Sequence, residues 1–288
     1  MSQPAIPPIA TFEAEIGRGR DGVTFLGPFG VHADNGGRLW VTDDLAHVAF
    51  VFSEEGHLVA RYGTRGGSPG QLLYPDGVTT DAQGNVYIAD AGANRVQILS
   101  GAWSPIAEIR RSSLFGGRLV NPRGVAVGPN GRVYVADFGN HCVQVFSSER
   151  RHVLSIGQQG AAPGEFINPV SVALDDAHQL YVADQGNHRI QVFDTDGHLL
   201  RVFGARGRDG GQFSSPMGLA VDASGRVYVA DSGNQRVQVL SAAGESLTVI
   251  GGSLESGVDR PVDVAVSAGR LYVSDAGRHS VQRYVISP

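Results

Sequence analysis

Four side chains able to exchange protons stand where other copies of a repeated pattern carry different, mostly uncharged residues. They are Asp44, Asp76, Asp263 and His32. A carboxyl or imidazole group serves as a general acid or base when its pKa lies near the working pH. We therefore interpret these four residues as the catalytic candidates of the chain.

Seven more residues at equivalent positions could hold a ligand beside these groups. Arg123 and Arg260 carry guanidinium groups, which anchor anions and stabilise developing negative charge. The aromatic and apolar candidates are Phe29, Tyr74, Phe138, Val170 and Met217. One charged wall facing one apolar wall suits a small amphiphilic ligand. The alternative is that the charges pair with each other, Asp263 with Arg260 for example, and have only a structural role.

The elements that position these residues repeat six times. A proline recurs at spacings of 47, 47, 47, 47 and 45 residues, and an aspartate recurs at spacings of 47, 47, 47, 47 and 44. The prolines are Pro28, Pro75, Pro122, Pro169, Pro216 and Pro261. The aspartates are Asp43, Asp90, Asp137, Asp184, Asp231 and Asp275. Repeats of 40–50 residues indicate one supersecondary unit per copy.

Each unit is predicted to contain four strands. In the third copy, apolar and β-branched runs cover residues 122–127, 132–137, 142–146 and 152–157, with turn residues between them. No segment shows a sustained helical period of apolar residues. Four short strands in a unit of this length are typical of a β-propeller blade. The sequence thus predicts an all-β, six-bladed propeller.

The ring is expected to close through the N-terminus. The last unit supplies only three strands, over 262–266, 270–275 and 280–285, while residues 11–17 form a strand with no unit of its own. That N-terminal strand should complete the sixth blade. We therefore predict a tail over residues 1–10 and one propeller domain over residues 11–288.

The predicted topology places the candidate site at one mouth of the central channel. The first strand of each blade starts at one face of the disk and the second returns to it, so the prolines and aspartates share this face, here called the top face. Ligand sites favour such concave mouths. Most of the charged candidates fall on blades 6, 1 and 2, which are neighbours in a closed ring, whereas Arg123 falls on blade 3.

The repeat resembles the NHL repeat. The resemblance rests on Asp184-Gln-Gly-Asn-His-Arg-Ile-Gln-Val-Phe193, Asp231-Ser-Gly-Asn-Gln-Arg-Val-Gln-Val239 and Pro122-Arg-Gly-Val-Ala-Val127. It implies a six-bladed propeller and not one function. Members of the family include RNA- and protein-binding modules, sensor domains of bacterial kinases and a zinc-dependent amidating lyase. The first and last blades depart most from the motif.

A bound metal is not favoured. His47, His141, His188 and His279 share one repeat position, but they belong to outer turns too far apart for one ion, and we interpret them as turn residues that bond locally. The lyase resemblance implies zinc-binding histidines near the mouth, where this chain has only His32. Calcium on Asp76, Asp263 and His32 is the remaining metal hypothesis, and no cofactor is otherwise expected.

The composition of the chain excludes some classes of function. The formal net charge is -5, all 23 basic residues are Arg, and there is one cysteine. The absence of Lys excludes Schiff-base chemistry on a lysine. One cysteine fits a reducing compartment. No run of 18 apolar residues exists and no secretory leader is visible at the start, so we expect a cytoplasmic protein without membrane partners.

Three functions stay open. The first is binding of a small molecule or a protein partner at the top mouth. The second is a stand-alone lyase, hydrolase or cyclase that uses the same acidic residues and His32. The third is RNA binding through Arg-rich loops of the top face, although the acidic net charge and the lack of an aromatic platform argue against nucleic acid.

Overall fold

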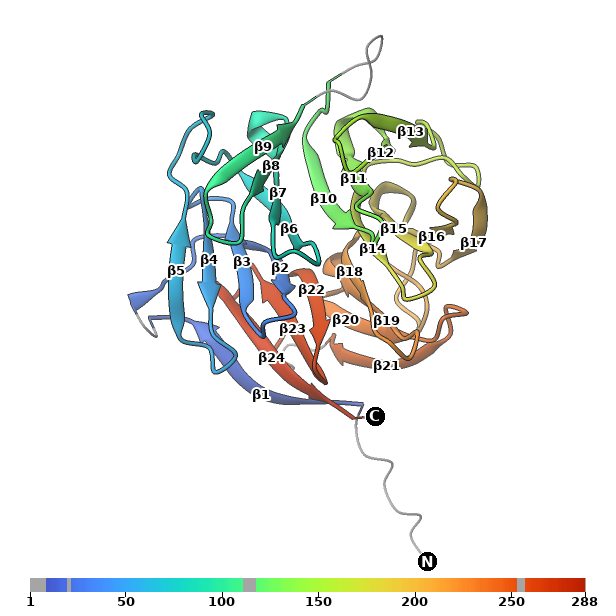
Figure 1. The fold of residues 1–288 in the computed structure, drawn as a ribbon. Helices are drawn as coiled ribbons and strands as arrows, with labels where there is room; N and C mark the ends of the chain where they lie inside the picture. Colours follow the sequence, from blue (N-terminus) through green and yellow to red (C-terminus); the bar gives the residue numbers. More distant parts are fainter. Residues whose placement is uncertain (1–8, 20–21, 111–117, 253–256, 288) are drawn as a thin grey trace, which may run out of the picture.

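The computed structural model describes residues 9–19, 22–110, 118–252 and 257–287. Six four-stranded antiparallel sheets stand around a common centre, and the strand that begins at the recurrent proline is the innermost strand of each sheet (Figure 1). The protein is therefore the six-bladed, all-β propeller that the repeat predicts.

The strands follow the repeat closely. Blades 1 and 2 consist of β2 (Pro28–Ala33), β3 (Leu39–Asp43), β4 (Val48–Phe52), β5 (Leu58–Tyr62), β6 (Pro75–Thr80), β7 (Val86–Asp90), β8 (Arg95–Leu99) and β9 (Pro105–Ile109). Blades 3 and 4 consist of β10 (Pro122–Val127), β11 (Val133–Asp137), β12 (Cys142–Phe146), β13 (His152–Ile156), β14 (Pro169–Leu174), β15 (Leu180–Asp184), β16 (Arg189–Phe193) and β17 (Leu199–Phe203). Blade 5 consists of β18 (Pro216–Val221), β19 (Val227–Asp231), β20 (Arg236–Leu240) and β21 (Ser246–Gly251).

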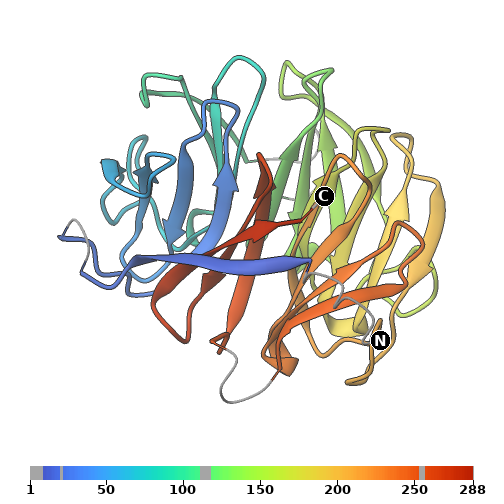
Figure 2. The same cartoon turned by 90° about the horizontal axis from the view of Figure 1, so that it is seen from below.

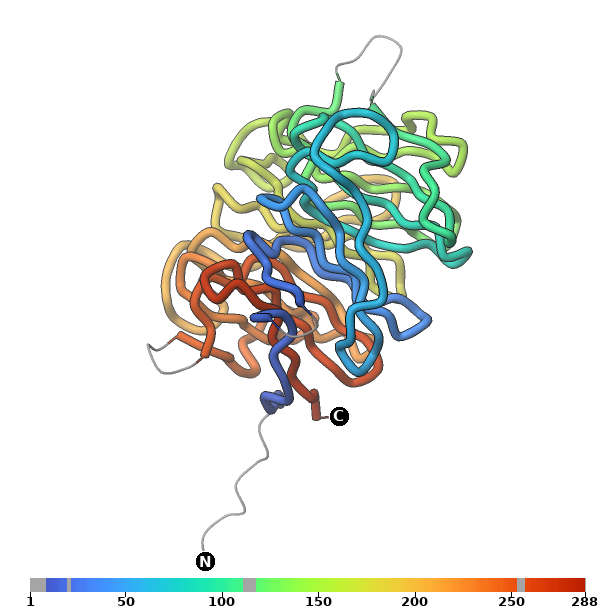
Figure 3. The backbone as a smooth tube through the Cα atoms, turned by 90° about the vertical axis from the view of Figure 1, so that its left-hand side faces the viewer, coloured from blue at the N-terminus to red at the C-terminus, as the bar shows by residue number. Residues whose placement is uncertain are grey.

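The sixth blade contains both ends of the chain. It consists of β22 (Pro261–Ser267), β23 (Arg270–Asp275), β24 (Ser280–Ile286) and β1 (Ala10–Gly17), in the sheet order β1-β24-β23-β22. Figures 2 and 3 show β1, in blue, alongside β24, in red. This confirms the predicted closure, although β1 begins one residue earlier than expected. Of the predicted tail, residues 1–8 lie outside the described residues.

Close packing of the inner strands requires glycine at one repeat position. A Cβ on Gly77 would lie 2.6 Å from the backbone oxygen of Arg123 in the next blade. A Cβ on Gly124 would lie 2.8 Å from Ser171 Cα. Since neither backbone can move away without opening the ring, a side chain at this position displaces a strand. In the two blades that carry a side chain there, Ser171 and Asp263 are paired with the second strand, whereas in the four glycine blades the pairing resumes only after the glycine.

The histidine turns connect adjacent blades. His47, His141 and His188 have left-handed backbone conformations, and each Nδ1 accepts a backbone N–H from the next blade's loop, at 3.1, 3.0 and 2.9 Å. The expectation that these residues bond locally is therefore wrong in one respect. Their hydrogen bonds cross from blade to blade, which explains why a short acceptor recurs there.

Short helices mark the regular blades. A 3-10 helix follows the recurrent aspartate in blades 2 to 5, at Ala91–Ala93 (η2), Phe138–Asn140 (η3), Gln185–Asn187 (η4) and Ser232–Asn234 (η5). Blades 1 and 6 have turns there instead. Among the described residues, no helix has the length and apolar character needed to cross a membrane.

Candidate functional site

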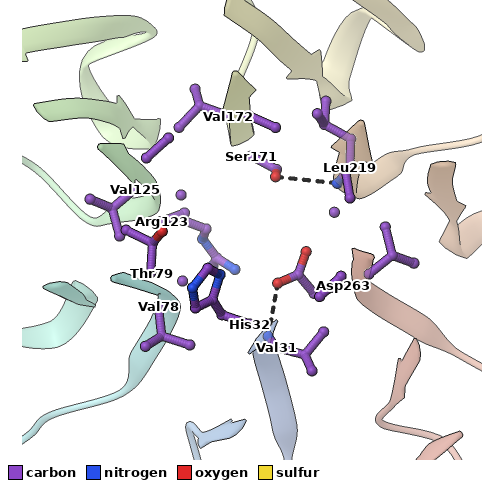
Figure 4. A pocket seen from close by; sticks show the side chains of 18 of the residues that line it. Val31, His32, Val78, Thr79, Arg123, Val125, Ser171, Val172, Leu219 and Asp263 are labelled. Carbon is purple, nitrogen blue, oxygen red and sulfur yellow. Dashed lines mark hydrogen bonds between the residues drawn. The ribbon is translucent and has the colours of Figure 1, made fainter. Parts of the chain in front are cut away.

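The inner strands surround a cavity of about 300 Å³ on the ring axis. This volume lies at the lower end of the range for small-molecule pockets. Figure 4 shows that Arg123, His32 and Asp263 extend toward its centre, opposite Val172 and Leu219. The cavity therefore has a mixed polar and apolar lining.

Arg123 and Asp76 form the centre of the site. Arg123 lies on β10 and Asp76 on β6, and Arg123 Nε is 3.3 Å from Asp76 Oδ2. The two atoms are misaligned, so both stay buried without a hydrogen-bond partner. The guanidinium group lies over the rings of Phe138, at 4.7 Å, and Phe29, at 5.5 Å. These rings fix its orientation through cation–π contacts.

Asp263 occupies the position that is glycine in four other blades. It lies on β22 of blade 6, and its Oδ2 accepts the backbone N–H of Val31 in blade 1 at 2.9 Å. Its own N–H donates to Ser274 Oγ at 3.0 Å. Ser171 acts in the same way on the other side of the ring, where its Oγ accepts the N–H of Leu219 at 3.3 Å. Both side chains thus link neighbouring inner strands within the cavity wall.

Burial disfavours the ionised form of the acidic groups of the site and so raises their pKa values. It raises the pKa of Asp76 to about 7, and Arg123 opposes this rise while Asp44 and Asp263 add to it. Burial also raises the pKa of Asp263 to about 7, against the stabilising N–H of Val31. The pKa of Asp44 is raised by burial and by the neighbouring Asp43. Two carboxyl groups can therefore gain or lose a proton near neutral pH.

His32 lines the same cavity, where its hydrogen-bond partner is Thr80. It lies further along β2, and its Nε2 is 2.9 Å from Thr80 Oγ1. Burial lowers its pKa to about 4, so the ring is neutral at physiological pH, and Asp34 is the carboxylate that partly opposes this. Within the described ranges, no three His, Cys, Asp or Glu side chains lie close enough to hold a metal ion. The structure thus does not assemble the calcium set of His32, Asp76 and Asp263.

The remaining candidates divide into a wall and a rim. Phe138, Val170 and Met217 pack in one apolar cluster, and of these three residues Val170 lines the cavity. Tyr74 is exposed, with its ring against His47 at 4.7 Å, outside the cavity. Arg260 is also exposed and acts on Asp44 through its charge. In the described part of the chain it forms no ion pair with Asp263, whereas Arg123 and Asp76 do form one, as the alternative of pairing among the charged residues expects in part.

The sequence analysis did not predict that two hydroxyl residues, Thr42 and Ser274, link the inner strands. Thr42 Oγ1 accepts the N–H of Gly30 at 2.8 Å and donates to the backbone oxygen of Asp76. Ser274 Oγ donates in the same way to the backbone oxygen of Phe29. Both precede the recurrent aspartate, where the other four copies have Ala89, Ala136, Ala183 and Ala230. That departure was a visible signal of this role.

The Arg-rich loops surround the mouth only in part. Arg65 and Arg206 lower the pKa of His47 and His188 through their charge, which places them on the top face. Arg110 forms an ion pair with Glu108. Arg20 and Arg111, which also supported the RNA hypothesis, lie outside the described residues. RNA binding therefore stays an untested prediction.

The fold and repeats define the class of this protein. The family model described as NHL repeat matches residues 72–99, 119–146, 166–193, 213–240 and 259–284. The chain belongs to the NHL-repeat family, as the motif resemblance indicated. A search of curated proteins found no match.

Solved structures with a similar fold include enzymes. A gluconolactonase from Xanthomonas campestris is 17% identical with a TM-score of 0.73, over 92% of this chain and 87% of the other. A catalytically inactive virginiamycin B lyase from Staphylococcus aureus, solved with quinupristin, is 16% identical with a TM-score of 0.66, over 95% and 85%. A streptogramin B lyase is 14% identical with a TM-score of 0.65, over 97% and 88%. At these identities the similarity concerns the fold alone.

Proposed function

We propose that this propeller binds a small organic molecule at the top mouth of its channel, between the charged side at Asp76, Arg123 and Asp263 and the apolar wall at Val170. The observation that carries the proposal is the buried ion pair of Asp76 and Arg123 next to the cavity, whose closest atoms, Oδ2 and Nε, are 3.3 Å apart and form no hydrogen bond. Buried polar atoms are normally hydrogen-bonded. A ligand with polar groups would satisfy both atoms.

Thermal unfolding in the presence of a library of small amphiphilic compounds tests this function. We expect some compounds to raise the Tm of the wild-type protein and to lose this effect in Asp76→Asn and Asp263→Asn. The matched control is Asp196→Asn, which makes the same change at an exposed residue that does not line the cavity. Compounds that stabilise all four proteins equally would bind elsewhere and contradict the proposal.

A second candidate function is a proton-transfer enzyme, a lyase or hydrolase that works at the same mouth. The observation that favours it is the pair of buried carboxyl groups with pKa values raised to about 7, because acids tuned to the working pH are efficient general acids and bases. Arg123 would stabilise negative charge as it develops. Known structures of this fold include a lyase and a gluconolactonase.

The enzyme hypothesis is tested by incubating the protein with lactones and cyclic depsipeptides and following product formation. Turnover that depends on an acidic group with an apparent pKa near 7, and that falls by about a hundredfold or more in Asp76→Asn or Asp263→Asn, would support general acid–base catalysis. Turnover that is unchanged in both variants would contradict it.

A protein partner, the alternative occupant of this face, would raise the Tm without filling the cavity.

A further inference from the structure

The contacts of Arg123 indicate which class of small molecule binds at the mouth. This inference rests on the proposed function. The guanidinium carbon of Arg123 lies over the rings of Phe138 and Phe29, 4.7 and 5.5 Å from their centroids, and a guanidinium group packs against rings through its face. Only the N–H edge is then left for hydrogen bonds. No described residue accepts a hydrogen bond from this edge, and the closest acidic atom, Asp76 Oδ2, is misaligned at 3.3 Å.

A planar guanidinium edge recognises a carboxylate by two parallel hydrogen bonds. Beyond Arg123 the channel continues between Val170, Val172 and Leu219, which offer no charge. A cavity of about 300 Å³ has room for a ring or a short hydrocarbon chain behind a carboxylate. We propose that the ligand of this mouth is a small organic acid, with its carboxylate on the edge of Arg123 and its hydrocarbon part in the channel.

The acidic residues of the mouth do not prevent a carboxylate from binding at Arg123. Arg123 on β10, Asp44 on the turn after β3 and Asp263 on β22 all face Asp76 and act on its charge. Burial raises the pKa of each of the three carboxyl groups, whereas a guanidinium group keeps its charge. The pKa values of Asp76 and Asp263 are raised to about 7, so these two carboxyl groups can be protonated near neutral pH, and a protonated carboxyl group can donate a hydrogen bond to a bound anion.

Proton uptake is a consequence of this arrangement. A carboxylate bound beside Asp76 places a second negative charge next to it and so raises its pKa further. Binding of the acid then includes binding of a proton to Asp76. Affinity should fall as the pH rises through the pKa of the free protein, about 7 for this group.

Isothermal titration calorimetry with benzoate, benzamide and benzylamine tests the inference. These probes share one ring and differ in carrying an anionic, a neutral and a cationic group. We expect benzoate to bind about ten- to hundredfold more tightly than benzamide, as two charge-assisted hydrogen bonds would give. We expect its affinity to fall by about tenfold from about pH 6 to about pH 8.

Three variants assign the effect to residues. Arg123→Leu should abolish the preference for benzoate, and Arg123→Lys should weaken it because the planar edge is lost. Asp76→Asn should reduce the pH dependence and leave a smaller part due to Asp263. Arg206→Leu removes the same charge from an exposed loop and should leave binding unchanged, provided that unfolding curves show all variants to be folded.

Two outcomes would overturn the inference. If benzamide or benzylamine binds as tightly as benzoate, and Asp76→Asn or Asp263→Asn removes that binding, the mouth binds small molecules but does not select organic acids. If benzoate binds and Arg123→Leu and Arg123→Lys leave its affinity unchanged, Arg123 is not the carboxylate anchor. The failure of the proposed function itself would instead appear in the library screen, as the absence of any compound sensitive to Asp76→Asn.

Discussion

At the scale of residues, the site consists of groups whose charged forms the fold disfavours. Asp76 and Asp263 have pKa values raised to about 7 by burial, and Asp76 does not use the neighbouring Arg123 to form a hydrogen bond. Buried polar groups without partners are costly. They are consistent with a functional site, because natural sequences break the rules of packing mainly where function requires it.

The raised pKa of Asp263 predicts a pH-dependent contribution to stability. The native state holds the proton up to about pH 7, while the unfolded chain releases it near the ordinary value of 3.8. The contribution is therefore present at low pH and lost as the pH rises toward 7. Relative to wild type, Asp263→Asn should gain about 2–3 kcal/mol in unfolding free energy between about pH 5 and about pH 8.

Urea denaturation of both proteins at the two pH values measures this difference. Asn keeps a carbonyl oxygen that can accept the N–H of Val31, so the comparison isolates the ionisation. Ser171→Ala, without a titratable group, should show the pH profile of the wild type. A constant difference between Asp263→Asn and wild type would show that Asp263 ionises normally in the folded protein.

The sequence identified the charged residues of the mouth but not their arrangement. The repeat placed Asp76 and Arg123 directly after the recurrent proline and Asp263 one position further on, and these side chains lie close enough to interact. Tyr74 and Arg260 share similar registers yet are exposed, because the loops before the prolines lie outside the cavity. Which direction a loop side chain takes depends on contacts with the next blade, and these cannot be inferred from spacing along one chain.

At the scale of elements, hydroxyl groups and glycines set the distances between inner strands. Thr42 links β3 to the backbone of β2 and β6, and Ser274 links β23 to the backbone of β22 and β2. These links occur where blades 6, 1 and 2 meet. They fix the strands from which Phe29, Asp76 and Asp263 extend.

Replacing Thr42 tests the link between blades 1 and 2. Thr42→Val keeps the shape and removes the hydroxyl group, leaving Gly30 N–H and Asp76 O without this partner. We expect a loss of about 1–3 kcal/mol in unfolding free energy. Thr42→Ser keeps the hydroxyl group and should cost less in the same chemical denaturation experiment. Equal losses in both variants would assign the effect to packing instead of hydrogen bonding.

Glycine at the close approach between blades gives a second prediction at this scale. Gly77→Ala would place a Cβ 2.6 Å from the backbone oxygen of Arg123. We expect a loss of about 1–3 kcal/mol and weaker ligand binding, because β10 must shift. Gly67→Ala is the matched control, since nothing lies within 4 Å of its Cβ. Thermal unfolding that is the same for both variants would show that the inner strands are not tightly packed.

At the scale of the whole molecule, the ring depends on pairing between the two ends of the chain. β1 pairs with β24 from Ala10 opposite Ile286 to Gly17 opposite Ser280. Ile16 also enters the apolar cluster of blade 1. The sequence predicted this closure because a unit with three strands and a strand without a unit complement each other. It did not predict the hydrogen bonds of the histidine turns to the next blade.

Removal of β1 should therefore destabilise the entire propeller. We expect deletion of residues 1–17 to lower the Tm strongly and to promote aggregation, because the edge of β24 becomes exposed. Deletion of residues 1–8 leaves the pairing intact and should have little effect. Differential scanning fluorimetry and light scattering report both quantities. An unchanged Tm after the longer deletion would mean that the ring is stable without its closing strand.

The central claim, that the top mouth is a small-molecule site, is tested most directly by soaking crystals with a library of small organic compounds and determining the structures. We expect electron density for bound compounds in the channel mouth, in contact with Arg123 and with Asp76 or Asp263. Compounds bound repeatedly elsewhere on the protein, with none at this mouth in crystals where the top face is open to solvent, would contradict it.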